Sequence, residues 1–125
     1  MISFNNIGHM GRLGNQMFQY AGLRGIAANH GYWYSIPEQT ELANCFKIPP
    51  TLENQNSNSI VVENFEFNQT FFDTCPDDID IVGYFQSEKY FKHIEKEIRK
   101  DLTFHDIIVE TCNRKKLDAQ LISLH

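Results

Sequence analysis

Residues 11–21 read Gly-Arg-Leu-Gly-Asn-Gln-Met-Phe-Gln-Tyr-Ala, and this stretch decides which fold the sequence predicts. Glycines at positions 8, 11 and 14 recur every third residue, which predicts a turn with unusual backbone freedom. The segment before the turn, residues 2–7, carries apolar side chains and predicts a first strand. The glycines therefore connect a strand to whatever element follows them.

That following element is predicted to be a helix over residues 15–30, with Asn15 as its N-terminal cap and Gly31 just past its end. Aromatic and apolar residues over 32–36 then predict a second strand. Strand, turn, helix and strand form a βαβ unit. The predicted fold class is therefore α/β with a mainly parallel sheet.

The middle of the chain continues this pattern. Ile60–Val62 and Phe65–Phe72 are short apolar stretches that predict strands, and a further sheet strand is expected over 79–85. Ser87 is expected to cap a helix that runs from Glu88 to about Leu102. Each of these elements suits an α/β sheet.

The end of the sequence predicts an unfinished element. Residues 104–117 are expected to form another helix or two short ones, and Leu121–Leu124 resembles the start of a strand that has no continuation after His125. No internal repeat or linker divides the chain. Residues 1–125 are therefore interpreted as one α/β portion of a larger domain.

Composition excludes several classes of protein. The chain has 125 residues, of which 42% are hydrophobic and 22% charged, as in ordinary globular proteins. Its net charge of -5 argues against general nucleic-acid binding. Three scattered cysteines without a C-x-x-C pair favour neither a disulfide framework nor a zinc site. No apolar run has the length of a membrane span and no signal peptide is evident. A cytoplasmic location is expected, with peripheral membrane association as the alternative.

The turn at residues 11–16 is the candidate ligand site. Glycines let the main chain approach a ligand, and the N–H groups of a helix N-terminus attract anions. Arg12 offers a fork of donors for phosphate, and Asn15 and Gln16 can hydrogen-bond sugar hydroxyls. The stretch is neither a Walker loop nor a G-x-G-x-x-G fingerprint. A tight strand-to-helix turn with a capping asparagine explains the spacing equally well.

Two stretches together resemble glycosyltransferase family 11, the α-1,2-fucosyltransferases. Gly11–Ala21 resembles the opening signature of that family, and Gly83–Phe91, which reads Gly-Tyr-Phe-Gln-Ser-Glu-Lys-Tyr-Phe, resembles a second family segment. A weaker likeness involves Leu42, Phe46 and Ile48, which also predict a small packed turn. The likenesses occur in the family's order and span nearly the whole chain, so the chain is similar to the N-terminal part of such an enzyme.

The resemblance implies a GT-B-like fold with the donor between two domains, and transfer of L-fucose from GDP-fucose to a galactose hydroxyl with inversion. It implies no metal. The related protein O-fucosyltransferases have a similar Gly-Arg-Phe-Gly-Asn-Gln loop at the GDP-fucose site. By that likeness Arg12, Leu13, Gly14, Asn15 and Gln16 would contact donor or acceptor sugar. The general base stays unassigned, since no Asp or Glu stands out.

One motif of the family is incomplete in this sequence. The family's donor-binding hallmark is His-x-Arg-Arg-Gly-Asp after an apolar strand, and residues 122–125 resemble that strand followed by its histidine, His125. The GDP-binding half is therefore expected to be absent from this chain, which alone is expected to be inactive. The alternative is a non-catalytic carbohydrate- or partner-binding module. A P-loop-like nucleotide binder is disfavoured, because no Gly-Lys-Ser/Thr follows the glycines.

Two other groups of residues have competing interpretations. An acidic cluster could hold a metal or form a solvated turn, and the turn is preferred; its members are Asp73, Asp77, Asp78 and Asp80. Trp33 lies between Tyr32 and Tyr34, so in a strand its side chain is expected to point away from both tyrosines.

Overall fold

A computed structural model describes residues 1–7, 13–38, 40–49, 51, 56, 58–63 and 66–104. Its centre is a four-stranded sheet with the order β2-β1-β4-β3, in which every neighbouring pair is parallel. The strands are β1 (Ile2–Ser3), β2 (Tyr34–Ser35), β3 (Ser59–Val62) and β4 (Asp80–Gly83). The predicted α/β class with a parallel sheet is confirmed.

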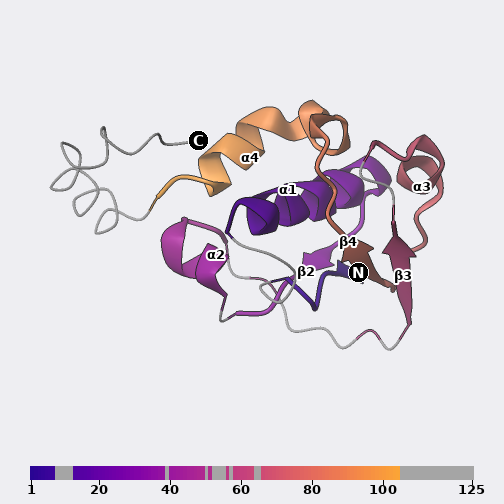
Figure 1. The fold of residues 1–125 in the computed structure, drawn as a ribbon, viewed down its shortest axis with the longest axis horizontal. Coiled ribbons are helices and arrows are strands. Elements are labelled where there is room, and N and C mark those ends of the chain that lie inside the picture. The colour runs from indigo at the N-terminus through magenta and orange to yellow at the C-terminus, as the bar shows by residue number, and fades with distance from the viewer. Residues whose placement is uncertain are drawn as a thin grey trace, which may run out of the picture.

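One long helix, α1 (Leu13–His30), connects β1 to β2 and lies between the sheet and the C-terminal part of the described chain (Figure 1). The shorter elements are α2 (Glu41–Cys45), α3 (Gln69–Thr74), the 3-10 turns η1 (Glu88–Tyr90) and η2 (Lys92–Ile94), and α4 (Glu95–Asp101). The core lies between the sheet, α1 and the segment after β4. Its largest fully buried side chains are Phe4, Tyr20, Phe46, Phe85 and Tyr90.

The start of the chain differs from the predicted boundaries. Strand β1 ends at Ser3, because the chain turns after Phe4, where the Ile7 N–H donates to the Phe4 carbonyl at 3.3 Å. Helix α1 begins at Leu13, so Asn15 lies inside its first turn. The prediction that Asn15 caps this helix is therefore wrong.

The predicted strand over residues 65–72 is also wrong, because a helix occupies much of it. Asn68 caps α3 by accepting a hydrogen bond from the Phe71 N–H at 2.9 Å. Phe67 and Phe72 pack on Tyr90, with ring centroids 4.8 and 6.2 Å from it. Aromatic residues such as these can pack in a core from a helical turn as well as from a strand. Likewise, the small packed turn predicted around Leu42 is helix α2, which Thr40 caps.

The helix predicted from Glu88 to Leu102 is broken into η1, η2 and α4. Ser87 does cap the first turn, accepting from the Lys89 N–H at 3.3 Å, as predicted. The interruption comes at Phe91, whose φ of -133° and ψ of 7° are not helical. Helix α4 therefore starts only at Glu95.

Most of the helix predicted at 104–117 and the strand predicted at 121–124 lie outside the described residues. Phe104 is described, and it forms an isolated antiparallel bridge with Phe46, whose ring centroid is 4.7 Å away. The Lys47 N–H also donates to the Thr103 carbonyl at 2.8 Å. These contacts bring the segment after α4 to the end of α2.

Candidate functional site

The candidate site lies at the carboxyl edge of the sheet, between the ends of β1 and β4. The chain leaves β1 through α1 to reach β2 on one side, whereas β4 pairs with β3 on the other side. The connections diverge between these two neighbouring strands. In open parallel sheets such a switch point forms a crevice that commonly binds ligands. The amino end of α1 is at this edge because it follows β1.

The predicted site residues fall in the first turn of α1. Leu13 and Asn15 are half-buried, Gly14 is exposed, and Gln16 is 2% exposed. The Oε1 atom of Gln16 is buried and has no hydrogen-bond partner in the described part of the chain. The two other predicted binding residues, Arg12 and His125, lie outside the described residues. The first N–H groups of a helix have no partner within that helix, so this turn combines such groups with amide side chains, a set of donors suited to anionic or hydroxylated ligands.

The structure brings the two family-like stretches into direct contact. The Nε2 atom of Gln86 donates to Oδ1 of Asn15 at 2.9 Å, although the residues are 71 positions apart. Close by, the rings of Phe18 and Phe91 are 6.3 Å apart. Sequence reasoning did not single out Gln86. Its position directly after a strand, at the same sheet edge as the glycine turn, was the signal that could have found it.

An unusual backbone conformation directs Gln86 toward α1. Phe85 has a φ of 52°, in the left-handed region that a bulky residue rarely adopts. Its ring is 1% exposed and packs edge-on against Phe4 and Tyr90 at 5.9 and 5.1 Å. A Cβ on Gly22 would lie 2.9 Å from the Phe85 Cβ, so the helix has no spare room here. The packed ring thus holds a strained turn at the edge of the site.

A second close approach lies farther along α1. A Cβ on Gly25 would lie 1.9 Å from the carbonyl oxygen of Tyr90, so only glycine allows this contact. Nε2 of His93 hydrogen-bonds the Gly25 carbonyl at 2.8 Å, and the Tyr90 hydroxyl accepts from the Asn68 N–H at 2.9 Å. These contacts fix the segment after β4 against the helix, and with it the position of Gln86.

A buried polar cluster joins α1 to α4. Asp101 is 4% exposed, pairs with Arg24, and accepts a hydrogen bond from the Tyr20 hydroxyl at 2.5 Å. Burial raises the pKa of Tyr20 well above its ordinary value near 10. Such a buried carboxylate needs its partners, because an unpaired charge is costly away from water.

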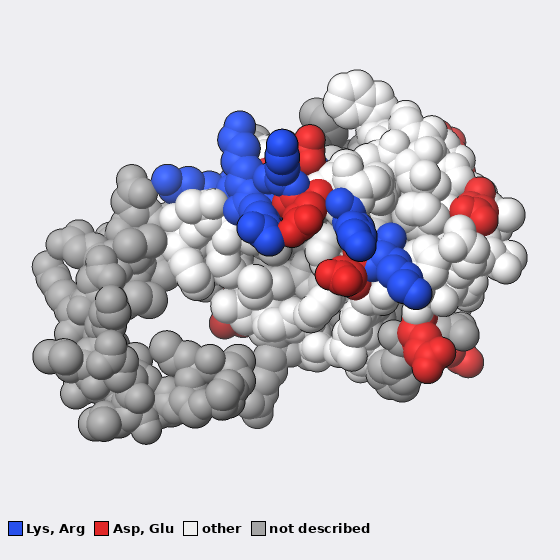
Figure 2. Space-filling model, turned by 90° about the horizontal axis from the view of Figure 1, so that it is seen from above, with Lys and Arg blue, Asp and Glu red and all other residues white. Residues whose placement is uncertain are grey.

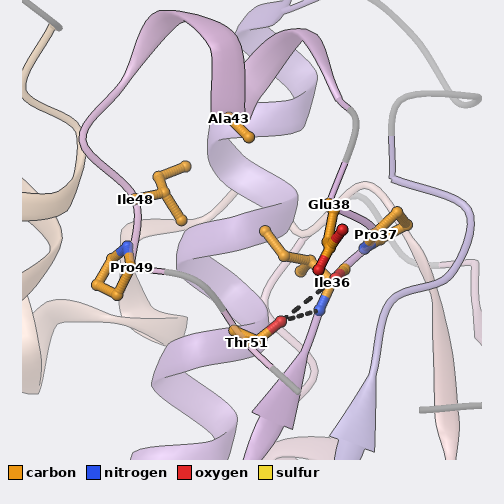
Figure 3. Close-up of a pocket in the computed structure, with 7 residues that line it drawn as sticks. All are labelled: Ile36, Pro37, Glu38, Ala43, Ile48, Pro49 and Thr51. Carbon is orange, nitrogen blue, oxygen red and sulfur yellow. Dashed lines mark hydrogen bonds between the residues drawn. The ribbon is translucent and has the colours of Figure 1, made fainter. Parts of the chain in front are cut away.

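A pocket of about 250 Å³ opens beside the end of β2 (Figure 3). Its lining is mostly apolar, with the carboxylate of Glu38 on one side; the residues are Ile36, Pro37, Glu38, Ala43, Ile48, Pro49 and Thr51. The Thr51 hydroxyl is occupied, since it accepts from the Ile36 N–H at 3.0 Å and donates to the Ile36 carbonyl at 3.3 Å. The pocket follows a parallel strand and so opens at the same edge as the amino end of α1.

Carboxylates of the acidic cluster accept hydrogen bonds from other parts of the chain. Asp80 accepts hydrogen bonds from the Asn5 N–H at 2.7 Å and the Ser3 hydroxyl at 3.2 Å. Asp77 and Asp78 both contact the amino group of Met1. Among the described residues, no group of His, Cys, Asp and Glu side chains is arranged to hold a metal.

The aromatic triplet that leads into β2 and ends at its first residue has the predicted arrangement. Trp33 is 79% exposed, whereas Tyr32 and Tyr34 are half-buried on the opposite side. The Tyr32 hydroxyl donates to the Cys75 carbonyl at 3.0 Å.

Charged side chains mix on the face formed by the last described elements. Figure 2 shows a band of Lys and Arg side chains with Asp and Glu side chains between them. Arg99, for example, pairs with Glu95 at 2.6 Å. This face therefore has no large surface of a single sign. In the part of the chain that the structure describes, no helix combines the length and apolar character needed to cross a membrane.

Comparisons with known proteins identify relatives that match most of the chain. Residues 1–122 match the family described as Glycosyl transferase family 11. Galactoside alpha-(1,2)-fucosyltransferase 2 of Oryctolagus cuniculus is 32% identical over 111 residues, which are 83% of this chain and 31% of that protein. The Mus musculus protein of the same name is 33% identical over 111 residues, covering 83% and 32%.

A third relative has a different name. Galactoside 2-alpha-L-fucosyltransferase SEC1 of Bos taurus is 32% identical over 102 residues, which are 76% of this chain and 28% of that protein. The chain thus spans about a third of the length of the curated relatives it matches. No solved structure matches it significantly.

Proposed function

This chain belongs to glycosyl transferase family 11, and from that membership we propose that its complete protein transfers L-fucose from GDP-fucose to a galactoside hydroxyl, forming an α-1,2 linkage with inversion. The names of the relatives support fucose as the transferred sugar, a galactoside as the acceptor and the α-1,2 linkage. The observation that carries the proposal is the family match over residues 1–122, and the hydrogen bond between Gln86 and Asn15 joins the two family-like stretches at one sheet edge.

The proposed chemistry divides between the donor and the acceptor. The leaving GDP carries negative charge, and the helix N-terminus with Arg12 would bind such a group. The acceptor hydroxyl must lose its proton, which requires a base. The pocket beside β2 offers an apolar surface for a sugar ring and the Glu38 carboxylate for hydroxyl groups. We propose no metal cofactor, so transfer is expected to persist in EDTA.

The test is transfer by the complete protein, with GDP-fucose as donor and lactose as acceptor. Arg12→Ala is expected to lower kcat/KM at least about tenfold, the equivalent of one charge-assisted hydrogen bond. Its melting temperature should stay nearly unchanged, because a long side chain among the glycines of a turn is expected to add little core packing, and such substitutions usually change stability by no more than about 0.5 kcal/mol. Arg99→Ala is the matched control, since Arg99 is 78% exposed and pairs with Glu95 one turn earlier on α4.

Three outcomes would contradict parts of this proposal. Unchanged kinetics in Arg12→Ala would make the glycine turn a structural joint only. Use of another nucleotide sugar in place of GDP-fucose would overturn the donor. Galactoside binding without any transfer would favour the alternative, a non-catalytic carbohydrate-binding module.

A further inference from the structure

The side-chain amide of Asn15 is held by one specific partner. Its Oδ1 atom accepts from Nε2 of Gln86 at 2.9 Å, whereas its Nδ2 group has no hydrogen-bond partner among the residues that the structure describes. An amide group has a donor side and an acceptor side, so occupying one determines what the other presents. With Oδ1 engaged, Asn15 presents two N–H donors to its surroundings.

The partner of Asn15 is itself fixed in place. Gln86 follows Phe85, whose buried ring and left-handed backbone leave little freedom for rotation. It precedes Ser87, whose side chain caps η1. The backbone of Gln86 is thus anchored on both sides, while its side chain is exposed and packs into no core. An exposed side chain on so rigid a backbone is suited to orienting a neighbour.

We propose that Gln86 is a positioning residue that orients the Asn15 amide, so that its Nδ2 group donates hydrogen bonds to an oxygen of the donor or acceptor sugar. This inference rests on the proposed function for the identity of the ligand. The orientation itself rests only on the geometry of the two amides. Gln86 acts through Asn15 and need not touch the ligand.

A double-mutant cycle on the complete protein tests the coupling, with GDP-fucose and lactose as substrates. Gln86→Ala is expected to lower kcat/KM about fivefold, the equivalent of one neutral hydrogen bond, with the melting temperature unchanged. In an Asn15→Ala background the same change should have no further effect, because its target is gone. An equal fivefold loss in both backgrounds, or no loss in either, would overturn the proposal.

Gln86→Glu tests the direction of the hydrogen bond. A carboxylate cannot donate, so Asn15 would have to turn its Nδ2 group toward Glu and present Oδ1 to the ligand. We expect a larger loss than in Gln86→Ala, about tenfold or more, that persists at high salt, where simple charge repulsion is screened. Activity equal to that of the parent protein would show that Asn15 faces the other way.

A readout on residues 1–125 separates this inference from the proposed function. In nuclear magnetic resonance spectra, the side-chain NH₂ signals of Gln86 should shift in Asn15→Ala, and those of Asn15 should shift only weakly in Gln86→Ala. That pattern supports the orientation even if the complete protein uses no GDP-fucose. The reverse pattern, with the strong shift on Asn15, overturns it whatever the enzyme transfers.

Discussion

Helix α1 meets the segment 83–91 in two contrasting ways. At its amino-terminal turn Gln86 donates a hydrogen bond to Asn15, and a Cβ on Gly14 would meet no described atom within 4 Å. In its middle, Gly22 and Gly25 touch the segment so closely that a Cβ at either would lie under 3 Å from it. One contact is open and polar, and the other is closed and packed.

The packed contact sets the position of segment 83–91 on the helix, whereas the polar contact lies at the candidate ligand site. The packed middle fixes how far along the helix the segment lies, because the backbone of Tyr90 fits only over a glycine. The open turn can then keep its amide groups and free N–H groups for a ligand. Substitutions in the middle should therefore change stability, and those at the turn should change ligand use.

The largest effect is expected from Gly25→Ala. The new methyl group would overlap the Tyr90 carbonyl oxygen, so the segment must move off the helix, at a cost of about 3 kcal/mol or more. Urea unfolding of residues 1–125 measures this. Gly14→Ala is the matched control, and it should stabilise by about 0.5–1 kcal/mol because alanine favours an exposed helix position. Equal stability of the two variants would contradict the contrast.

The next effect is expected from Asp101→Asn, which breaks the polar cluster on the packed side. Arg24 would lose its charged partner and the Tyr20 hydroxyl would lose a strong acceptor. We expect a loss of about 2–3 kcal/mol, below the cost for a fully buried pair because Arg24 is 22% exposed. Thermal melting checks this value. A variant as stable as the parent would show that α4 does not depend on the cluster.

A further effect is expected at alkaline pH, which deprotonates buried thiol and hydroxyl groups of the core. Burial raises the pKa of the Cys75 thiol from 9.0 to about 11, and it raises the pKa of Tyr20 and Tyr90 above 10.0. Groups with a raised pKa in the folded state bind protons more tightly there than in the unfolded chain. Stability is therefore complete below about pH 9 and falls as pH rises through 11.

Urea unfolding from pH 8 to 11 measures this decline, and Cys75→Ala should make it shallower. An undiminished stability at pH 11 would mean that these groups are open to water.

The smallest effect is expected from Glu95→Gln, which removes an exposed ion pair from α4. Glu95 and Arg99 are 51% and 78% exposed, so solvent screens their interaction. The expected loss is about 0.3–0.5 kcal/mol. This loss of stability is the reference value for surface substitutions in the same melting experiment. A loss as large as that of Asp101→Asn would show that this exposed ion pair contributes as much to stability as the buried polar cluster does.

Local patterns in the sequence predicted much of the fold. The glycine turn between apolar stretches correctly indicated a βαβ unit, because strands, turns and helices each have their own periodicity. Prediction failed where distant residues decided the outcome. The stretch around Phe72 became helical against Tyr90, and the expected long helix broke at Phe91 beside Gly25.

The binding roles of all the candidate site residues stay predictions. Leu13, Gly14, Asn15 and Gln16 lie in the first turn of α1, where Asn15 is inside the helix and does not cap it. Arg12 and His125 lie outside the described residues, so their roles stay predictions. Gln86 was missed, because nothing in its local sequence says which side chain it meets 71 positions earlier.

The sequence by itself determined the parallel α/β class, the family and the presence of a helix after β1, because each depends on short-range periodicity or on a contiguous motif. The tertiary structure alone decided that Gln86 holds Asn15, that Phe85 adopts a left-handed conformation, and that Gly25 lies under Tyr90. Those features depend on how closely two distant segments approach. That distance is set by the packing of the whole core, and no local pattern encodes it.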